Sequence, residues 1–137
     1  MAYHVTMGRD NRLLDKRNRK LAILAAFAMH ERRAEDVLIL DIRLLADYAD
    51  YFVIGSADSL ARLRGVVRRV EEVMAKQGAI RLNRAERDSG WALADYGDIL
   101  IHVFEREARN FYRLEELWGD APQVKWRDHL PKTGEKN

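Results

Sequence analysis

Gly55 and Ser56 lie in a sequence context that is typical of phosphate-binding sites in enzymes. They follow an apolar run that begins at Tyr51, and a helical pattern begins near Leu60. Nucleotidyltransferases cradle a triphosphate with such a strand, Gly-Ser turn and helix, and they hold two magnesium ions with two carboxylates spaced by one residue on the next strand. That place falls at residues 66–69, which are two valines and two arginines. Polymerase-like catalysis is therefore disfavoured, and a nucleotide-binding or nucleotidyltransferase-like enzyme with its pocket at Gly55-Ser56 stays the alternative hypothesis.

Other reactive side chains lack the spacing that catalysis or metal binding requires. Asp95 and Asp98 flank a turn, where they suit hydrogen bonds to turn amides better than shared metal coordination. His102, inside an expected strand, is interpreted as a packed histidine rather than a general base. There is no cysteine, and the histidines show no metal-ligand spacing: His4, His30, His102 and His129. We therefore expect no cofactor, no metal and no enzymatic activity.

A protein-binding surface explains the stretch from Trp91 to Trp118 better. Aromatic side chains lie close in sequence to carboxylates there, and an aromatic patch rimmed with acid suits a basic protein partner. Core packing is the preferred interpretation for Phe111, Leu114 and Trp118, because these share one helical stripe, whereas Trp91 and Tyr112 are stronger interface candidates. The full set of interface candidates is Trp91, Asp95, Tyr112, Leu114, Glu115 and Trp118.

A hairpin and a helix must position these candidates. Residues 91–95 alternate apolar and polar side chains, Gly97 supplies the positive φ of a tight turn, and residues 98–104 continue as a β-rich run. The second run is apolar on both faces, which predicts an inner strand. After Phe104 the hydrophobic period lengthens to nearly four, so a short helix should follow and end at Gly119.

The upstream chain supplies the remaining elements. We expect an alanine-rich helix over about 17–33, a buried strand over 36–42, a strand over 51–55 and a short strand over 79–82. A helix over 60–77 should be capped by Asp58 or Ser59 and ended by Gly78. The sequence thus predicts an α/β fold with a mixed sheet of about five strands flanked by helices. We expect a flexible extension at 1–16, one domain at 17–120 and a disordered tail at 121–137.

Composition sets the outer limits. The chain has 137 residues and a net charge of +2, enough length for one core without disulfides. No apolar run reaches the roughly 18 residues of a membrane span, and no signal core opens the sequence, so we expect an unexported protein with no membrane contact. The 60–77 helix has four arginines, and two glutamates can pair with them at helical spacing, which favours a solvated face over an anionic partner. The basic cluster at 16–20 is interpreted in the same way.

The stretch from Trp91 to Trp118 also carries a specific motif. Its residues follow the pattern W-x-L-x-D-x-G-D, then I-H-V-F, then R-x-F-Y-x-L-E-x-L-W. Upstream, Asp41, the D-Y-F-V-I of residues 50–54, Ser56 and Ser59 match further positions. In these residues the chain resembles the ribosomal silencing factor family, RsfS or Iojap-like, and the resemblance covers about residues 21–122.

The resemblance implies a function that composition and spacing do not give. It implies a nucleotidyltransferase-like fold without catalytic carboxylates. It also implies binding to the large ribosomal subunit at ribosomal protein L-fourteen, which prevents the small subunit from joining and lowers translation when nutrients are scarce. A homodimer is implied in the free state, with a bacterial cytoplasmic location or, for an organellar homologue, an organelle.

Two features depart from the family pattern. Glu86 is followed by Arg87 where the family commonly has glycine, and the loop to Trp91 is shortened. The amino-terminal extension and the tail lie outside the signature, and they are candidates for a peripheral contact with ribosomal RNA through phosphates, which would make binding salt-sensitive.

Overall fold

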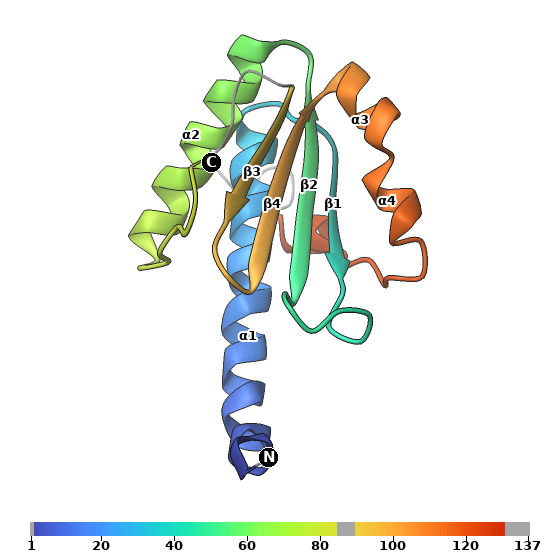
Figure 1. Cartoon of the computed structure of the whole chain (residues 1–137). Coiled ribbons are helices and arrows are strands. Elements are labelled where there is room, and N and C mark those ends of the chain that lie inside the picture. The colour runs from blue at the N-terminus through green and yellow to red at the C-terminus, as the bar shows by residue number, and fades with distance from the viewer. Residues whose placement is uncertain (1, 85–89, 131–137) are drawn as a thin grey trace.

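Four strands form one mixed sheet in the part of the chain that the computed structural model describes, residues 2–84 and 90–130. The strands are β1 (Glu35–Asp41), β2 (Tyr51–Ala57), β3 (Trp91–Asp95) and β4 (Ile99–Glu105), in the order β1-β2-β4-β3 (Figure 1). β2 and β4 are parallel, and the outer strands pair antiparallel with them. The predicted α/β class, the hairpin and the inner position of β4 are confirmed, but the strands number four instead of about five.

The missing strand is the one expected at residues 79–82. This segment runs beside the edge of β3 and makes one backbone bond there, from Leu82 N to Asp95 O at 2.7 Å. The Asn83 side chain makes the next two hydrogen bonds to the β3 backbone, in place of a further strand residue. Its Nδ2 donates to Leu93 O, and its Oδ1 accepts from Asp95 N, both at 2.8 Å. A side-chain amide has the same donor and acceptor as a peptide group, so one asparagine satisfies this edge without a ladder.

Two long helices cover one face of the sheet: α1 (Ala2–Glu31) and α2 (Leu60–Lys76). The α2 helix begins where Ser59 Oγ accepts a hydrogen bond from Arg62 N at 3.1 Å, and Gly78, with φ 75°, follows its end. Its predicted apolar face is buried: Leu63, Val66, Val67, Val70 and Met74. These residues share a core with the alanine-rich part of α1 and with alternate residues of every strand.

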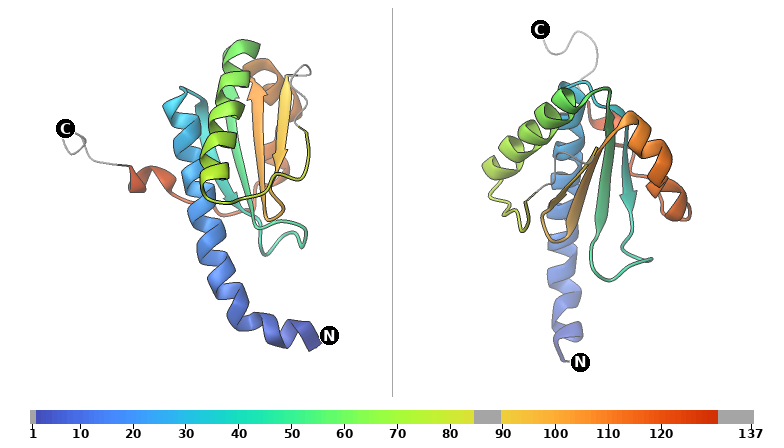
Figure 2. Two further views of the ribbon diagram at one scale, coloured as in Figure 1. Left: turned by 90° about the vertical axis from the view of Figure 1, so that its left-hand side faces the viewer. Right: turned by 45° about the horizontal axis from the view of Figure 1, so that its top comes forward.

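The α1 helix begins at Ala2, far earlier than the expected start near Arg17. Among its described side chains, which begin at Leu13, the first buried one is Asn18, and the amino-terminal part of the helix projects beyond the end of the sheet (Figures 1 and 2). An existing helix can extend without a new nucleation step, which explains how helix continues through residues that lack a hydrophobic period. In the described ranges no helix, α1 included, combines the length and the apolarity needed to cross a bilayer.

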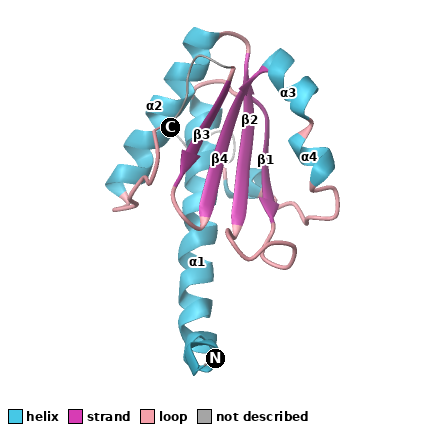
Figure 3. Ribbon diagram, viewed as in Figure 1, coloured by secondary structure: helices cyan, strands magenta, loops and turns pink. Residues whose placement is uncertain are grey.

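The second face of the sheet carries two short helices, α3 (Arg106–Tyr112) and α4 (Leu114–Leu117), in place of the single helix expected there (Figure 3). Arg113 interrupts them, with φ 50° and ψ 47° in the left-handed region. Three side chains of this segment pack on Phe52, Ile54 and Phe104 of the sheet: Ala108, Leu114 and Trp118. The break lets the chain follow the sheet surface while both pieces keep an apolar side against it.

Residues 121–130 also differ from expectation, because they lie against β1 instead of forming a loose arm. Val124 N donates to Ile39 O at 2.9 Å, and Asp41 N donates to Pro122 O at 2.8 Å. The short 3-10 helix η1 (Trp126–His129) follows, and its Trp126 indole is 3% exposed. The sequence pattern gave no sign of this because the contact depends on an edge of β1 more than 80 residues away. Residues 131–137 lie outside the described part.

A candidate protein-binding face

Gly55 and Ser56 do not form an open phosphate turn. Both lie inside β2 and are buried, and α2 begins only at Leu60. A Cβ atom on Gly55 would lie 2.9 Å from Met29 Sδ, so α1 packs directly on this point of the strand. The absence of a side chain at Gly55 lets the Met29 thioether lie against the strand, and a Cβ here would require that side chain to shift. This geometry leaves no space for a triphosphate at the residues that the alternative hypothesis requires.

The signature residues Ser56, Arg109 and Glu115 form one polar network instead. Arg109 is 6% exposed and donates from Nη1 to Ser56 Oγ at 2.8 Å and from Nε to Glu115 Oε2 at 3.0 Å. The same guanidinium reaches Glu35 O at 3.3 Å. A guanidinium group has five N–H donors in a fixed planar arrangement. Arg109 of α3 can therefore bind β1, β2 and α4 at the same time. Glu115 therefore supports the fold with one oxygen, while its buried Oε1 has no hydrogen-bond partner in the described structure.

A second network accounts for two further acids of the signature. Asn18 Nδ2, buried on α1, donates to Asp50 Oδ2 and to Asp98 Oδ2, both at 3.1 Å. Burial raises the pKa of Asp50, and the nearby Asp98 carboxylate adds to that rise. Asp98 was expected to bind turn amides, but it joins α1 to the hairpin. These acids hold the scaffold together rather than forming a metal site, and the described residues contain no cluster of three or more metal-ligating side chains.

An aromatic row crosses the second face of the sheet. Its consecutive ring centroids are 6.0 Å apart for Trp91 and His102, 4.8 Å for His102 and Phe52, 5.3 Å for Phe52 and Trp118, and 6.4 Å for Trp118 and Tyr48. The last three contacts are edge-to-face, the geometry that aromatic quadrupoles favour. The row joins β3 to α4 and to the loop before β2, so it brings together the two tryptophans predicted for the interface.

His102 fixes the orientation of Trp91 within this row. The Trp91 indole Nε1 donates to His102 Nδ1 at 3.2 Å, so Nδ1 carries no proton and the neutral ring holds its proton on Nε2. Burial lowers the pKa of His102 to about 4. The ring is therefore neutral at physiological pH and acts as a hydrogen-bond acceptor. This agrees with its interpretation as a packed histidine.

Much of this face is open to solvent. No described helix lies over β3 and β4 on the side opposite α1, as Figure 1 shows, and Trp91, Leu93 and Leu100 are half-exposed. At the other end of the row Tyr48 is 58% exposed, and Leu117, beside Trp118 in sequence, is 76% exposed. We call this surface the docking face; its residues are Tyr48, Trp91, Leu93, Leu100, Leu117 and Trp118. Large apolar side chains gathered in this way are typical of interaction sites.

Carboxylates lie around the docking face. Asp47 and Glu116 are exposed and adjacent in sequence to Tyr48 and Leu117. Asp95 is half-buried at the end of β3, and one of its oxygens accepts a hydrogen bond from Gly97 N at 2.8 Å. An apolar centre with an acidic rim complements a basic protein surface.

The six predicted interface residues therefore have different positions. Trp91 and Trp118 lie in the aromatic row, and Leu114 packs beneath α4 on the same cluster. Asp95 lies at the rim, and Glu115 is engaged by Arg109. Tyr112 ends α3, and its side chain lies outside the described structure, as does the loop with Glu86 and Arg87. Sequence reasoning did not name Tyr48 or Leu117 as interface residues: Tyr48 belongs to a loop without a hydrophobic period, and Leu117, although part of the motif, was not singled out within it.

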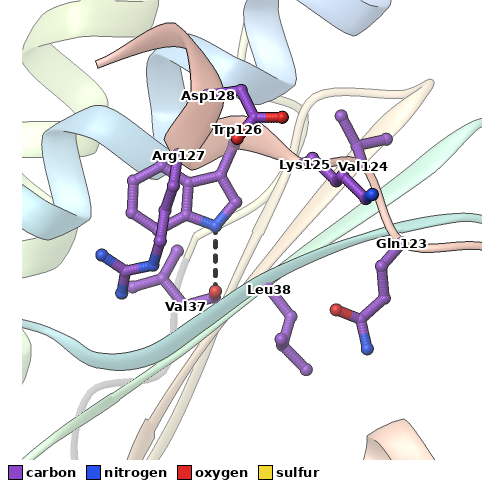
Figure 4. A pocket seen from close by; sticks show the side chains of 8 residues that line it. All are labelled: Val37, Leu38, Gln123, Val124, Lys125, Trp126, Arg127 and Asp128. Carbon is purple, nitrogen blue, oxygen red and sulfur yellow. Dashed lines mark hydrogen bonds between the residues drawn. The ribbon is translucent and has the colours of Figure 1, made fainter. Parts of the chain in front are cut away.

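Two hollows lie away from the aromatic row. One, of about 270 Å³, is lined by charged and polar residues of α3 and α4: Arg109, Asn110, Arg113, Glu115 and Glu116. The other, of about 350 Å³, lies between β1 and residues 123–128, where Trp126 Nε1 donates to Val37 O at 2.9 Å (Figure 4). Asp128 is the single carboxylate that lines it. Neither lining holds the histidine or serine of a hydrolytic triad.

Comparison with known proteins places the chain in a family. The family described as "Ribosomal silencing factor during starvation" matches residues 15–137. The ribosomal silencing factor RsfS of Bacillus subtilis (strain 168) is 38% identical over 101 residues, covering 72% of this chain and 85% of the relative. The chloroplastic protein Iojap of Zea mays is 30% identical over 103 residues, covering 75% of this chain and 45% of the maize protein.

Similarity extends to a solved structure. A crystal structure from Bacillus halodurans superposes with a TM-score of 0.68 and 29% sequence identity, covering 78% of this chain and 98% of that one. Residues 15–137, which match the family, include all four strands and the whole docking face. The chain therefore belongs to the ribosomal silencing factor family.

Proposed function

We propose that this protein binds the large ribosomal subunit through ribosomal protein L-fourteen and blocks joining of the small subunit, so that translation falls when nutrients are limiting. The observation that carries the proposal is the aromatic row on an open sheet face, rimmed by carboxylates. Family membership supports a role in ribosome silencing. The mechanism is occupancy: a bound protein excludes the partner subunit without any covalent step.

The docking face supports this proposal energetically. Interface tryptophans and tyrosines carry a large share of binding energy because they bury a wide area with little loss of side-chain entropy. Trp91 is already oriented by His102, and Trp118 by Phe52. Pre-orientation lowers the entropy cost of association. The acidic rim adds attraction to a basic partner and favours one docking orientation.

The binding step is tested by exchanging one rim charge. We expect Asp95→Lys to weaken co-sedimentation with purified large subunits by about tenfold or more, because a favourable charge contact becomes a repulsive one. The matched control is Asp128→Lys, the same charge change at an exposed position on η1. Circular dichroism should show that both variants are folded. Undiminished binding of the Asp95 variant would remove Asp95 from the interface.

The blocking step needs its own assay. Large subunits saturated with the protein should form fewer joined ribosomes with added small subunits, as measured by light scattering or gradient sedimentation. Asp95→Lys should restore joining in proportion to its loss of binding. Full joining at saturating protein would show that the protein binds without blocking, and the occupancy mechanism would be abandoned.

An enzyme with a nucleotide site at Gly55-Ser56 is the alternative function. The burial of both residues and the contact of Gly55 with Met29 weigh against it. A calorimetric titration with nucleoside triphosphate and magnesium should give no specific heat. A saturable heat that disappears in Ser56→Ala would favour the alternative.

The free protein is proposed to be a homodimer, which hides apolar surface until the ribosome is bound. Sedimentation equilibrium measures this directly. The proposed location is the bacterial cytoplasm, and an organelle with ribosomes of bacterial type is the second possibility, since the relatives include a bacterial and a chloroplastic protein.

A further inference from the structure

The amino-terminal part of α1 is an arm that projects from the fold. The helix spans 30 residues, and from residue 13 on, where its side chains are described, the first buried one is Asn18. Helical rise places residues 2–14 along roughly 20 Å beyond the body. Figures 1 and 2 show this part extending past the end of the sheet in each view. The family match begins only at residue 15, so the arm is an addition to the shared domain.

Positive charge is concentrated at the base of this arm. Residues 9–20 contain six basic and two acidic residues, a net charge of +4, whereas the whole chain carries +2. The remainder of the chain is therefore net negative. One of the two acids, Asp15, is already paired with Arg43 on the sheet side at 3.1 Å. The net charge of this short helical segment is therefore opposite in sign to the net charge of the rest of the chain.

Three described cations at the base of the arm remain available to an external anion. Lys16, Arg17 and Lys20 are exposed, and within the described part of the chain no ion pair joins them to a carboxylate. The arginines of α2 behave differently: Arg62 pairs with Asp58, and Arg69 pairs with Glu31 and Glu72. Both groups of cations are solvated, as expected, but those of α2 are paired within the fold, whereas Lys16, Arg17 and Lys20 keep their charge available to an outside anion.

We propose that the base of the arm, through Lys16, Arg17 and Lys20, contacts the phosphates of ribosomal RNA when the docking face is bound. The inference rests on the proposed function, because the ribosome then presents RNA beside the protein partner. Phosphate contacts need charge and reach but little shape complementarity. Exposed lysine and arginine side chains at the base of a projecting helix offer both. The arm adds salt-dependent affinity, while the docking face supplies specificity.

Salt dependence of binding tests the arm. Affinity of the full chain for purified large subunits is measured between low and moderate salt for the wild type and for the triple variant Lys16→Gln, Arg17→Gln, Lys20→Gln. Glutamine keeps helix propensity close to that of lysine and arginine. Each lost phosphate contact lowers the slope of log affinity against log salt by about 0.7 to 0.9. We expect the triple variant to lose about 2 from the slope and to bind more weakly at low salt.

A control variant removes the same charge elsewhere. Arg32→Gln, Arg68→Gln and Lys76→Gln change three exposed cations, one in the turn after α1 and two on α2. Their slope should stay close to that of the wild type. Equal slopes for the two triple variants would overturn the arm proposal while leaving the proposed function intact. Failure of the wild type to bind large subunits would overturn both, so the two failures are distinguishable.

Discussion

At the scale of single residues, the family motif separates into residues that build the fold and residues that face a partner. Arg109 and Ser56 are buried and bind each other, whereas Trp91 and Trp118 keep half-exposed rings. Such a division is invisible in a sequence, since Ser56 and Arg109 are 53 residues apart. Local reasoning predicted the Asp95 contact with the turn amide, but it missed Asn18, the partner of Asp98 on a distant helix.

His102 provides a prediction for pH. Its folded pKa of about 4 lies below the unfolded value of 6.5, so the unfolded chain binds more protons between these values. Stability is therefore unaffected by this group above about pH 6.5, and it falls by about 3 kcal/mol as the pH drops to about 4. Urea unfolding of the wild type and of His102→Asn across this range measures the difference, because the other acids titrate in both. An NMR titration of the imidazole near 6.5 would contradict the prediction.

At the scale of elements, local signals were sufficient for the hairpin and for α2. Gly97, with φ 86°, and the Ser59 cap are where turn and capping chemistry place them. The same reasoning failed where tertiary contacts decide the outcome. The hydrophobic period of a helix continues through Arg113 in the sequence. The helix is nevertheless interrupted there, so that Leu114 and Trp118 can reach the sheet.

Arg113 gives the prediction for this break. A left-handed conformation costs an L-residue about 1 kcal/mol or more, and glycine avoids that cost but loses more entropy on folding. We expect Arg113→Gly to raise the free energy of unfolding by about 0.5 kcal/mol and Arg113→Val to lower it by about 1 kcal/mol, since β-branched residues fit positive φ worst. Chemical denaturation checks both variants. Greater stability of the valine variant would show that the break is not left-handed in solution.

At the scale of the whole molecule, residues 121–130 complete the core. Val124 and Trp126 join the cluster formed by α1, α2 and the sheet, and the indole lies near Phe27 and His30. Composition predicted a disordered tail here, because two prolines and many polar residues outweigh four apolar side chains in any local count. The deciding factor is the free edge of β1, whose backbone groups need partners.

Trp126 tests this docking. We expect Trp126→Ala to lower the free energy of unfolding by about 3 kcal/mol, because it empties a buried site. Trp126→Phe should cost about 1 to 2 kcal/mol, mainly because Val37 O loses its donor. Lys125→Ala, at an exposed neighbouring position, should change stability by less than about 0.5 kcal/mol. Thermal or urea unfolding measures all three, and a neutral Trp126→Ala would mean that the segment is undocked in solution.

The parallel pairing of β2 with β4 has a consequence for how the chain folds. Tyr51 pairs with Ile99, so this ladder joins residues 48 positions apart, whereas β3 and β4 are connected by three turn residues. Closing a long loop costs chain entropy before any contact compensates for it. The hairpin and α2 can form from local contacts alone, and the central ladder is the step that commits the chain to its native topology. The pairing of β2 with β4, at the middle of the finished sheet, therefore costs more chain entropy than the pairing of any strands that are neighbours in sequence.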